Sequence, residues 1–308
     1  MTDYKMHVLV CGGTGCKAAE ADEIKESFSK QIQEAGLAED TQVVFTGCFG
    51  FCEKGPIVKV LPDNTFYVTV QPSDVEEIVN EHLIKGRPVQ RLLYKDPVTD
   101  EKISDSKGMD FYKKQMRIAL RNCGFINPES IDEYISRDGY MALGKCLSEL
   151  TPEETIEEVK GSGLRGRGGG GFPTGLKWEI TRKSEADQKY VVCNADEGDP
   201  GAFMDRSILE GDPHSVIEAM AICGYCIDAS KGLVYIRAEY PLAIERLETA
   251  LKQAREYGLL GKDILGTGFD FEIDIRLGAG AFVCGEETAL IHSMEGLRGE
   301  PTFKPPFP

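Results

Sequence analysis

Four cysteines near the start of the chain form two close pairs that could bind a metal ion or an iron–sulfur cluster. Cys11 and Cys16 are separated by Gly-Gly-Thr-Gly, and Cys48 and Cys52 are separated by Phe-Gly-Phe. Thiolates are the ligands that structural zinc and iron–sulfur clusters have in common. An alternating apolar run, which predicts a β-strand, precedes each pair. The thiols are therefore expected in loops at the ends of two strands.

Three kinds of thiol chemistry compete for these residues. A disulfide framework is disfavoured, because the N-terminus has no secretory signal. The other cysteines lie in apolar or helical surroundings typical of a reduced cytosolic protein: Cys123, Cys146, Cys193, Cys223, Cys226 and Cys284. Zinc remains the alternative, although zinc knuckles usually have two-residue spacers. Here the spacers of four and three are rich in glycine, whose N–H groups can turn toward cluster sulfurs, and this favours an iron–sulfur cluster.

The first 85 residues predict a small α/β domain. Apolar periodicity and turn residues place strands at 5–10 and 42–46, helices at 19–35 and after Ser73, and a hairpin at 57–70. This frame with C-x4-C and C-x3-C pairs resembles a thioredoxin-like [2Fe-2S] ferredoxin. The resemblance implies that Cys11, Cys16, Cys48 and Cys52 are the cluster ligands.

The composition indicates a protein with more than one domain. The chain has 308 residues, of which 41% are hydrophobic, which is enough for more than one core. A net charge of −16 argues against a nucleic-acid surface. No apolar run reaches the roughly 20 residues that span a bilayer. We expect a first domain at 1–85, a linker or wrapping arm at 86–108 and a second domain at 109–308.

A glycine-rich tract suggests a second site. Seven glycines occur in the eleven residues from Gly161 to Gly171, between predicted helices (109–122, 128–137, 140–149 and 152–160) and a predicted buried strand (189–194). The tract is too short and irregular for a typical flexible linker or Arg-Gly repeat. A glycine loop that enters a helix suits a phosphate or a flat aromatic ligand, because N–H groups can approach it closely. Arg165, Arg167 and Lys177 would add positive charge.

Two later segments resemble a known family when they are taken with the glycine loop. One is Tyr190-Val-Val-Cys-Asn-Ala-Asp-Glu-Gly-Asp-Pro-Gly-Ala-Phe203, and the other runs from Ile273 through Gly278-Ala-Gly-Ala-Phe-Val-Cys-Gly-Glu-Glu-Thr-Ala-Leu290. Together they resemble the flavin- and NADH-binding subunit of respiratory complex I and of soluble NAD-linked hydrogenases, over about residues 109–308. The resemblance implies an α/β FMN/NADH-binding domain after the thioredoxin-like domain, with FMN and NAD(H) as cofactors.

The resemblance also assigns individual cofactor contacts. From the glycine loop come Gly166, Arg167, Gly168, Gly169, Gly170, Gly171, Phe172, Pro173, Thr174, Gly175 and Lys177; from the acidic turn come Asn194, Asp196, Glu197 and Asp199; from the last segment come Phe282, Gly285, Glu286, Glu287, Lys304 and Phe307. Many relatives carry Tyr at the place of Phe282, and often Glu at that of Asp199. No catalytic side chain is expected, because hydride passes directly between NAD(H) and FMN. Carboxylates near the ribose would favour NAD(H) over NADP(H).

The fusion of the two domains resembles the B subunit of electron-bifurcating [FeFe]-hydrogenases. This implies an NADH:acceptor oxidoreductase (diaphorase) subunit of a cytoplasmic complex. Its partners would be a hydrogenase-type catalytic subunit, a small [2Fe-2S] thioredoxin-like subunit and ferredoxin. The alternatives are the matching subunit of an NAD-dependent formate dehydrogenase, an NADH dehydrogenase module, or a docking module with only the cluster active. The family continues beyond Lys304-Pro-Pro-Phe-Pro308 into more of the flavin pocket and a [4Fe-4S] motif, so we expect an incomplete second domain.

Cys223 and Cys226 form a C-x-x-C pair within a predicted amphipathic helix, residues 212–226. A redox motif would need a reactive, low-pKa thiol, whereas an amphipathic helix buries its apolar face. We predict that both are core thiols. A strand at 232–237 and a helix at 241–257 are expected to follow.

Overall fold

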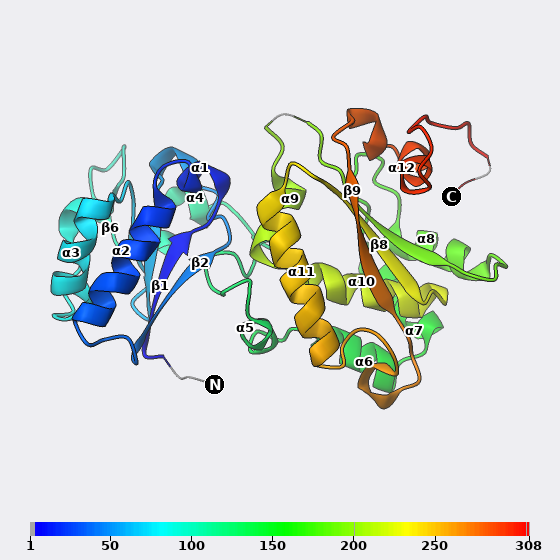
Figure 1. The fold of residues 1–308 in the computed structure, drawn as a ribbon, viewed down its shortest axis with the longest axis horizontal. Helices are drawn as coiled ribbons and strands as arrows, with labels where there is room; N and C mark the ends of the chain where they lie inside the picture. Colours follow the sequence, from blue (N-terminus) through cyan, green and yellow to red (C-terminus); the bar gives the residue numbers. More distant parts are fainter. Residues whose placement is uncertain (1–3, 200, 306, 308) are drawn as a thin grey trace. The chain divides into compact units, whose positions relative to one another are not determined.

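A computed structural model describes residues 4–199, 201–305 and 307. The chain divides into two compact units, which appear with their elements labelled in Figure 1. The first comprises Met1–Pro128 with Glu210–Asp212, and the second comprises Glu129–Leu209 with Pro213–Pro308. The first unit is larger than the domain expected at 1–85, because the chain after residue 85 packs back onto it.

The first unit is built on a mixed sheet of four described strands in the order β2-β1-β3-β4. Strand β1 (Met6–Cys11) pairs in parallel with β2 (Thr41–Thr46) and antiparallel with β3 (Val58–Leu61), which pairs with β4 (Thr65–Tyr67). Helix α2 (Ala21–Glu34) buries Ile24, Phe28 and Ile32, whose spacing of four residues predicted this face. A short helix, α1 (Thr14–Lys17), lies between β1 and α2.

The final helix of the predicted domain begins differently from the expectation. A 3-10 turn at Pro72–Asp74 precedes α3 (Val75–Glu77) and a π-helical stretch at Ile78–Leu83. Ser73, after which the sequence places this helix, does not cap it. Asp74 and Gln71 form a capping box instead, in which the Asp74 carboxylate accepts the Gln71 N–H at 2.8 Å. Asp74 sits three residues after Gln71, which is the spacing that a capping box requires.

Residues 86–128 wrap the first unit. The Val68 N–H donates to the Leu92 carbonyl and the Phe66 N–H donates to the Ser104 carbonyl, so the arm continues the hydrogen bonding of β4. It contains β5 (Tyr94–Lys95), β6 (Lys102–Ile103) and 3-10 turns at Gln90–Leu92 and Ser106–Gly108. The predicted helix at 109–122 is wrong, because only α4 (Asp110–Lys113) is helical and turns follow it.

The second unit contains a parallel sheet in the order β7-β8-β9. Its strands are β7 (Tyr190–Ala195), β8 (Lys231–Arg237) and β9 (Glu272–Gly278), close to the predicted positions. Strand β7 lies at the edge of the sheet and buries only Val191 and Ala195, so the prediction of a buried strand is wrong for its other residues. Because all three strands run in parallel, the loops that follow them meet at one edge.

Helices surround this sheet. Helix α7 (Pro152–Gly161) begins at a capping box that Thr151 and Glu154 form. The helix predicted at 212–226 is α10 (Pro213–Ile227), and a separate helix, α9 (Met204–Gly211), ends just before Asp212. The others are α5 (Ile131–Ile135), α6 (Met141–Glu149), α8 (Thr174–Lys183), α11 (Pro241–Glu256) and α12 (Glu287–Met294), with 3-10 turns at Ile264–Gly266 and Phe282–Gly285. None of the described helices is long and apolar enough to cross a membrane.

A buried polar network joins α10 to the chain around α5 and α6. The Tyr140 hydroxyl lies 2.9 Å from His214 Nδ1, and His214 Nε2 lies 3.1 Å from Gln253 Oε1. The Glu218 carboxylate accepts the Tyr134 hydroxyl at 2.6 Å and the Tyr140 N–H at 2.9 Å. Because the Gln253 oxygen can only accept, Nε2 of His214 must carry a proton, and the Tyr140 hydroxyl donates to Nδ1 when the ring is neutral. Burial lowers the pKa of His214 to about 4.

We predict that the second unit loses stability when the pH falls from 7.5 to 5. His214 has a lower pKa in the folded state than the roughly 6.5 of an unfolded chain, so its contribution is full above pH 6.5 and falls as the pH drops toward 4. The expected decrease in the free energy of unfolding is about 2 kcal/mol. Urea unfolding followed by the fluorescence of Trp178 would measure it.

In that experiment His214→Gln should have a smaller pH dependence than the wild type over the same interval. His292→Gln is the matched control, because His292 lies on α12 and its ring contacts the backbone carbonyl of Glu300 instead of a buried network. Equal pH dependence in the wild type and His214→Gln would contradict the assignment.

Candidate cofactor sites

The two cysteine pairs meet because their strands are parallel neighbours. Cys11 ends β1 and is paired in register with Thr46 at the end of β2, so the loops that follow these strands emerge at the same edge. The thirty-one residues between Cys16 and Cys48 form α2 and β2. Cys11 and Cys16 are buried, whereas Cys48 is half-buried and Cys52 is exposed. The site therefore begins inside the unit and reaches its surface.

Glycines line the space around the four sulfur atoms. A Cβ on Gly13 would lie 3.0 Å from Cys48 Sγ and 3.6 Å from Cys11 Sγ, and a Cβ on Gly55 would lie 2.8 Å from Cys16 Sγ. The Gly50 N–H donates to Cys48 Sγ at 3.3 Å. Side chains at Gly13 and Gly55 would occupy the space that the thiols need. Close packing thus explains Gly13 in the first spacer, and the hydrogen bond to sulfur involves Gly50 in the second.

The four thiols are close neighbours. Cys16 contacts Cys11, Cys11 contacts Cys48, and Cys48 contacts Cys52; the contact with Cys16 raises the pKa of Cys11 to about 12. Cys16 also interacts electrostatically with Cys48 and Cys52. Among the residues that the structure describes, no three His, Cys, Asp or Glu side chains surround one point as ligands of a single metal ion. Four neighbouring thiols match the ligand number of a [2Fe-2S] cluster, in which each iron takes two thiolates.

A covering segment that the sequence analysis missed lies over the second pair. The Tyr112 hydroxyl donates to the Phe49 carbonyl at 2.9 Å, and the Arg117 guanidinium donates to the Cys48 carbonyl at 3.3 Å. The Phe111 ring is 4.9 Å from the Phe51 ring. These contacts explain why the helix predicted at 109–122 stops at residue 113, since residues 112 and 117 are held by the cysteine loop.

At the second site, the turns after β7 and β9 lie against each other. Asn194 Nδ2 donates to the Gly285 carbonyl at 2.8 Å, and Asn194 Oδ1 accepts the Asp196 N–H at 3.1 Å. A Cβ on Gly198 would lie 3.0 Å from the Phe282 ring. The strand order brings together predicted contacts that are about ninety residues apart in the sequence.

Asp196 is the least satisfied polar side chain at this edge. Both of its carboxylate oxygens are buried and have no hydrogen-bond partner. Arg237 Nε is 3.8 Å from Oδ1, and burial raises the pKa of Asp196. Buried carboxylate oxygens without partners are unfavourable. The position therefore fits a ligand whose hydroxyl or N–H groups would donate to these oxygens, as those of a flavin can.

Arg237 and Tyr240 were not predicted from the sequence. Arg237 ends β8, the middle strand, and Tyr240 lies just after it; both donate to the Glu197 carbonyl, at 3.1 and 2.8 Å. The Glu197 carboxylate accepts the N–H groups of Met204, Asp205 and Arg206 at 2.8 to 3.2 Å. Glu197 therefore stabilises the N-terminus of α9, a role that its place in an acidic turn does not reveal. Only the position of β8 between β7 and β9 could have pointed to Arg237.

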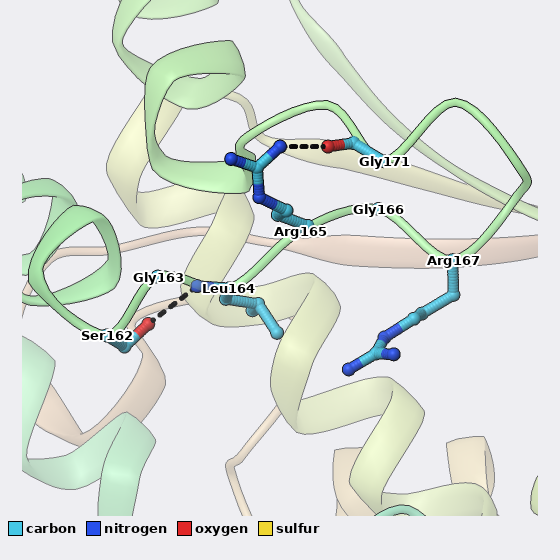
Figure 2. Close-up of a pocket in the computed structure, with 7 residues that line it drawn as sticks. All are labelled: Ser162, Gly163, Leu164, Arg165, Gly166, Arg167 and Gly171. Carbon is cyan, nitrogen blue, oxygen red and sulfur yellow. Dashed lines mark hydrogen bonds between the residues drawn. The ribbon is translucent and has the colours of Figure 1, made fainter.

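The glycine loop is a closed turn with open space beside it. The Gly166 N–H donates to the Phe172 carbonyl at 2.9 Å, and Arg165 Nη1 donates to the Gly171 carbonyl at 3.0 Å. Figure 2 shows Arg165 directed across the loop and Arg167 directed away from it. The loop borders a cavity of about 500 Å³, and Gly169 has a φ of 100° that favours glycine. These features suit a bound phosphate or ring.

Gly175 differs from the other loop glycines. A Cβ there would lie 2.7 Å from the Lys160 backbone nitrogen and 3.1 Å from the Ile156 carbonyl. Gly175 thus allows α8 to approach α7. By contrast, no atom lies within 4 Å of an added Cβ at Gly168, Gly169, Gly170 or Gly171.

Lysines connect the glycine loop helix to the last segment. Lys177 Nζ lies 3.6 Å from the Glu287 carboxylate, and Lys304 pairs with Glu287 and with Glu286 at 3.1 Å. Glu286 caps α12 by accepting the Thr288 and Ala289 N–H groups, and its contacts, led by the Thr288 hydroxyl, lower its pKa to about 2. Phe172, Phe282 and Phe307 are exposed, as is Asp199. Pro173 and Thr174 form the start of α8.

Cys223 and Cys226 have the surroundings predicted for core thiols. Cys226 is buried and Cys223 is half-buried, and burial raises the pKa of each to about 12. Both are therefore protonated and poor nucleophiles at neutral pH.

Comparison with known families agrees with the two sites. Residues 3–83 match the thioredoxin-like [2Fe-2S] ferredoxin family, and residues 159–308 match the Nuo51 FMN-binding domain. The chain thus belongs to the class of proteins that join a thioredoxin-like [2Fe-2S] domain to a Nuo51-type FMN-binding domain. The predicted resemblance, the fold class and these two cofactors are confirmed.

Particular relatives come from hydrogenases and from complex I. The chain is 70% identical over 196 residues to the NADP-reducing hydrogenase subunit HndC of Solidesulfovibrio fructosivorans, covering 64% of this chain and 40% of that protein. It is 37% identical over 320 residues to the NAD-reducing hydrogenase HoxS subunit alpha of Cupriavidus necator, covering 99% and 49%. It is 49% identical over 182 residues to a subunit of the NADH-quinone oxidoreductase of Escherichia coli, covering 59% and 41%. The chain thus spans less than half the length of these curated relatives.

A solved structure shares the fold. The structure of an NAD⁺-reducing [NiFe]-hydrogenase in the H2-reduced state superposes with a TM-score of 0.52 at 23% identity. The superposition covers 99% of this chain and 48% of that one.

We predict that Gly13→Ala will reduce [2Fe-2S] occupancy. The added methyl would lie 3.0 Å from Cys48 Sγ, so the thiol must move from its place in the site. Iron and sulfide per chain, with the visible absorption of the anaerobically purified protein, should fall at least twofold. Gly144→Ala is the control, because an added Cβ there has no neighbour within 4 Å. Wild-type iron content in Gly13→Ala would refute the packing argument.

Proposed function

We propose that this chain is an NAD(H)-linked electron-transfer subunit, which exchanges hydride between NAD(H) and FMN and single electrons with the [2Fe-2S] cluster. The buried carboxylate of Asp196, whose oxygens have no hydrogen bond at the carboxyl edge of the parallel sheet, carries the proposal. When bound, FMN can accept a hydride and release electrons one at a time. This chemistry requires an acceptor of single electrons. The four thiols of the first unit would hold such an acceptor, the [2Fe-2S] cluster.

Binding and orientation are the tasks of the residues at the second site. Asn194 and Asp196 would hold the flavin, and the glycine loop would leave room for phosphate and rings. The exposed Phe172 and Phe282 would stack on flat ligands. None of these residues needs to act as a nucleophile or base, because orienting the two rings and excluding water are what hydride transfer requires.

NAD(H) is proposed as the nucleotide. The relative that covers 99% of this chain is named an NAD-reducing hydrogenase subunit, and the complex I relative is named an NADH-quinone oxidoreductase subunit. The relative at 70% identity is named NADP-reducing, so the names of the relatives do not decide between NAD(H) and NADP(H). The choice of NAD(H) rests on the charged residues of the second site. Glu287 lies at the junction of the glycine loop helix and the last segment, where its charge would repel a 2′-phosphate.

A hydrogenase-type complex is the proposed setting. Two relatives carry hydrogenase names. One of them, the HoxS subunit alpha, aligns with 99% of this chain and therefore with both of its domains. A hydrogenase-type catalytic subunit, a small [2Fe-2S] thioredoxin-like subunit and ferredoxin are the proposed partners, and electron bifurcation is the proposed role of the complex. Anaerobic co-purification tests this: a molybdenum-type catalytic subunit in place of a hydrogenase-type one would indicate a formate dehydrogenase.

The direct test of the redox proposal uses the FMN- and iron-loaded chain. Anaerobic NADH should bleach the flavin and then reduce the cluster, which electron paramagnetic resonance detects. A protein that holds iron but neither retains FMN nor is reduced by NADH would be a docking module, and the proposal would fail.

Asp196→Asn should weaken FMN binding about tenfold or more, because a charge-assisted hydrogen bond contributes roughly 1.5–3 kcal/mol. The free protein should not be destabilised, since burial already raises the pKa of this carboxyl and the variant removes a buried charge. Flavin fluorescence titration and thermal unfolding measure the two effects. Asp274→Asn, at an exposed position of β9, is the control. Unchanged FMN affinity in Asp196→Asn would count against the site.

Glu287→Gln should weaken reduction of the flavin by NADH and narrow the preference for NADH over NADPH. The change removes one negative charge beside Lys177 and Lys304, which would then be available to a 2′-phosphate. Stopped-flow rates of flavin bleaching with each nucleotide give the ratio. Glu295→Gln, just after α12, is the control. An unchanged ratio would overturn the assignment of Glu287.

A further inference from the structure

A second cavity lies wholly within the first unit, beside the loop of Cys48 and Cys52. It has a volume of about 250 Å³ and is lined by Phe49, Lys59, Ser106, Lys107, Tyr112, Lys113, Arg117, Cys123 and Phe125. Four of these nine residues are cationic and none is acidic. This is unusual for a chain that carries 51 acidic and 35 basic residues.

The cations come from separate parts of the unit and are held in different ways. Lys59 belongs to β3 and is only 2% exposed; its Nζ donates to the Gly124 carbonyl at 3.4 Å and lies 3.8 Å from the centre of the Phe125 ring. Arg117 is half-buried and donates to the Cys48 carbonyl. Lys107 and Lys113 lie at the exposed rim, where Lys113 also has Asp110 at 3.6 Å. An anion in the cavity would interact favourably with several of these charges at once.

The segment that supplies three of the four cations is basic, although the chain as a whole is acidic. Residues 107–121 contain five basic residues and one acidic residue, whereas the whole chain has a net charge of −16. Like charges gathered around one hollow repel one another, and a low-dielectric wall strengthens both that repulsion and the attraction of an anion.

We propose that this cavity binds a small phosphate-class anion. Its volume is below the 300–1,000 Å³ of typical pockets for drug-sized ligands, which favours inorganic phosphate, diphosphate or the phosphate end of a larger metabolite. Arg117 would provide planar donors, Lys59, Lys107 and Lys113 point charges, and the Ser106 hydroxyl a further donor. The site is separate from the glycine loop of the second unit and does not depend on the proposed function.

Binding of an anion in the cavity should also be detectable at the cluster that the four cysteines would hold. Arg117 contacts both the cavity and the Cys48 carbonyl, so an anion there would partly neutralise the positive charge nearest that loop. Nearby charge and hydrogen bonding tune cluster properties. Anion binding would therefore change the visible circular dichroism of the cluster and shift its reduction toward lower potential.

Calorimetric titration of the FMN- and iron-loaded full chain with inorganic phosphate and with pyrophosphate tests the proposal. Ionic strength is held constant with sodium chloride, which separates binding from screening. The wild type should bind pyrophosphate, and Lys107→Gln/Lys113→Gln should weaken it about tenfold or more. These lysines are exposed at the rim, so their loss should leave folding and iron content unchanged.

Lys30→Gln/Lys252→Gln is the matched control, with the same change in net charge at two lysines whose side chains are 75% and 77% exposed. It should keep wild-type affinity. Arg117→Gln should abolish the anion-dependent change in cluster dichroism. Three outcomes would overturn the proposal: no binding of either probe, equal weakening in both double variants, or binding of an acidic polyglutamate peptide with no binding of pyrophosphate. The last would identify a docking surface for an acidic protein.

Discussion

Parallel strand pairing is the constraint on which both cofactor sites depend. In the first unit the pairing of β1 with β2 puts Cys11 beside Thr46, so two loops thirty-one residues apart present four thiols together. In the second unit β7, β8 and β9 run in parallel, and the turns that follow them form one edge. Antiparallel pairing would send alternate loops to opposite ends of the sheet. One topological rule therefore assembles two chemically different sites.

Close backbone approach is the second requirement, and glycine meets it in three distinct ways. Gly13 and Gly55 leave room for sulfur atoms, Gly175 lets two helices touch, and Gly168 to Gly171 leave space open for a ligand. A glycine-rich composition alone does not separate these roles. The distances from an added Cβ do, because they distinguish a crowded glycine from an unobstructed one.

Charge is distributed unevenly over this acidic chain. The Glu197 and Glu286 carboxylates cap α9 and α12, where helix dipoles stabilise them, while the Asp196 carboxylate is buried without a hydrogen bond. The first two are satisfied by their own protein, and a bound ligand would satisfy the third. In the first unit, Lys59, Lys107, Lys113 and Arg117 line a cavity whose lining residues include no acidic side chain. The candidate ligand sites lie where the folded chain brings together charged side chains from separate segments.

Residue types and short spacings determined much of this protein from the sequence. The two cysteine pairs, the glycine loop and the strands of the second unit follow from local periodicity and composition. The family resemblance followed from the glycine loop and the segments at 190–203 and 273–290. Tertiary structure alone decided that Glu197 caps a helix, that Arg237 joins the site, and that the expected helix ends at Lys113, with Tyr112 and Arg117 bound to the cysteine loop. These outcomes depend on contacts between residues far apart in the chain, and local sequence periodicity does not encode such contacts.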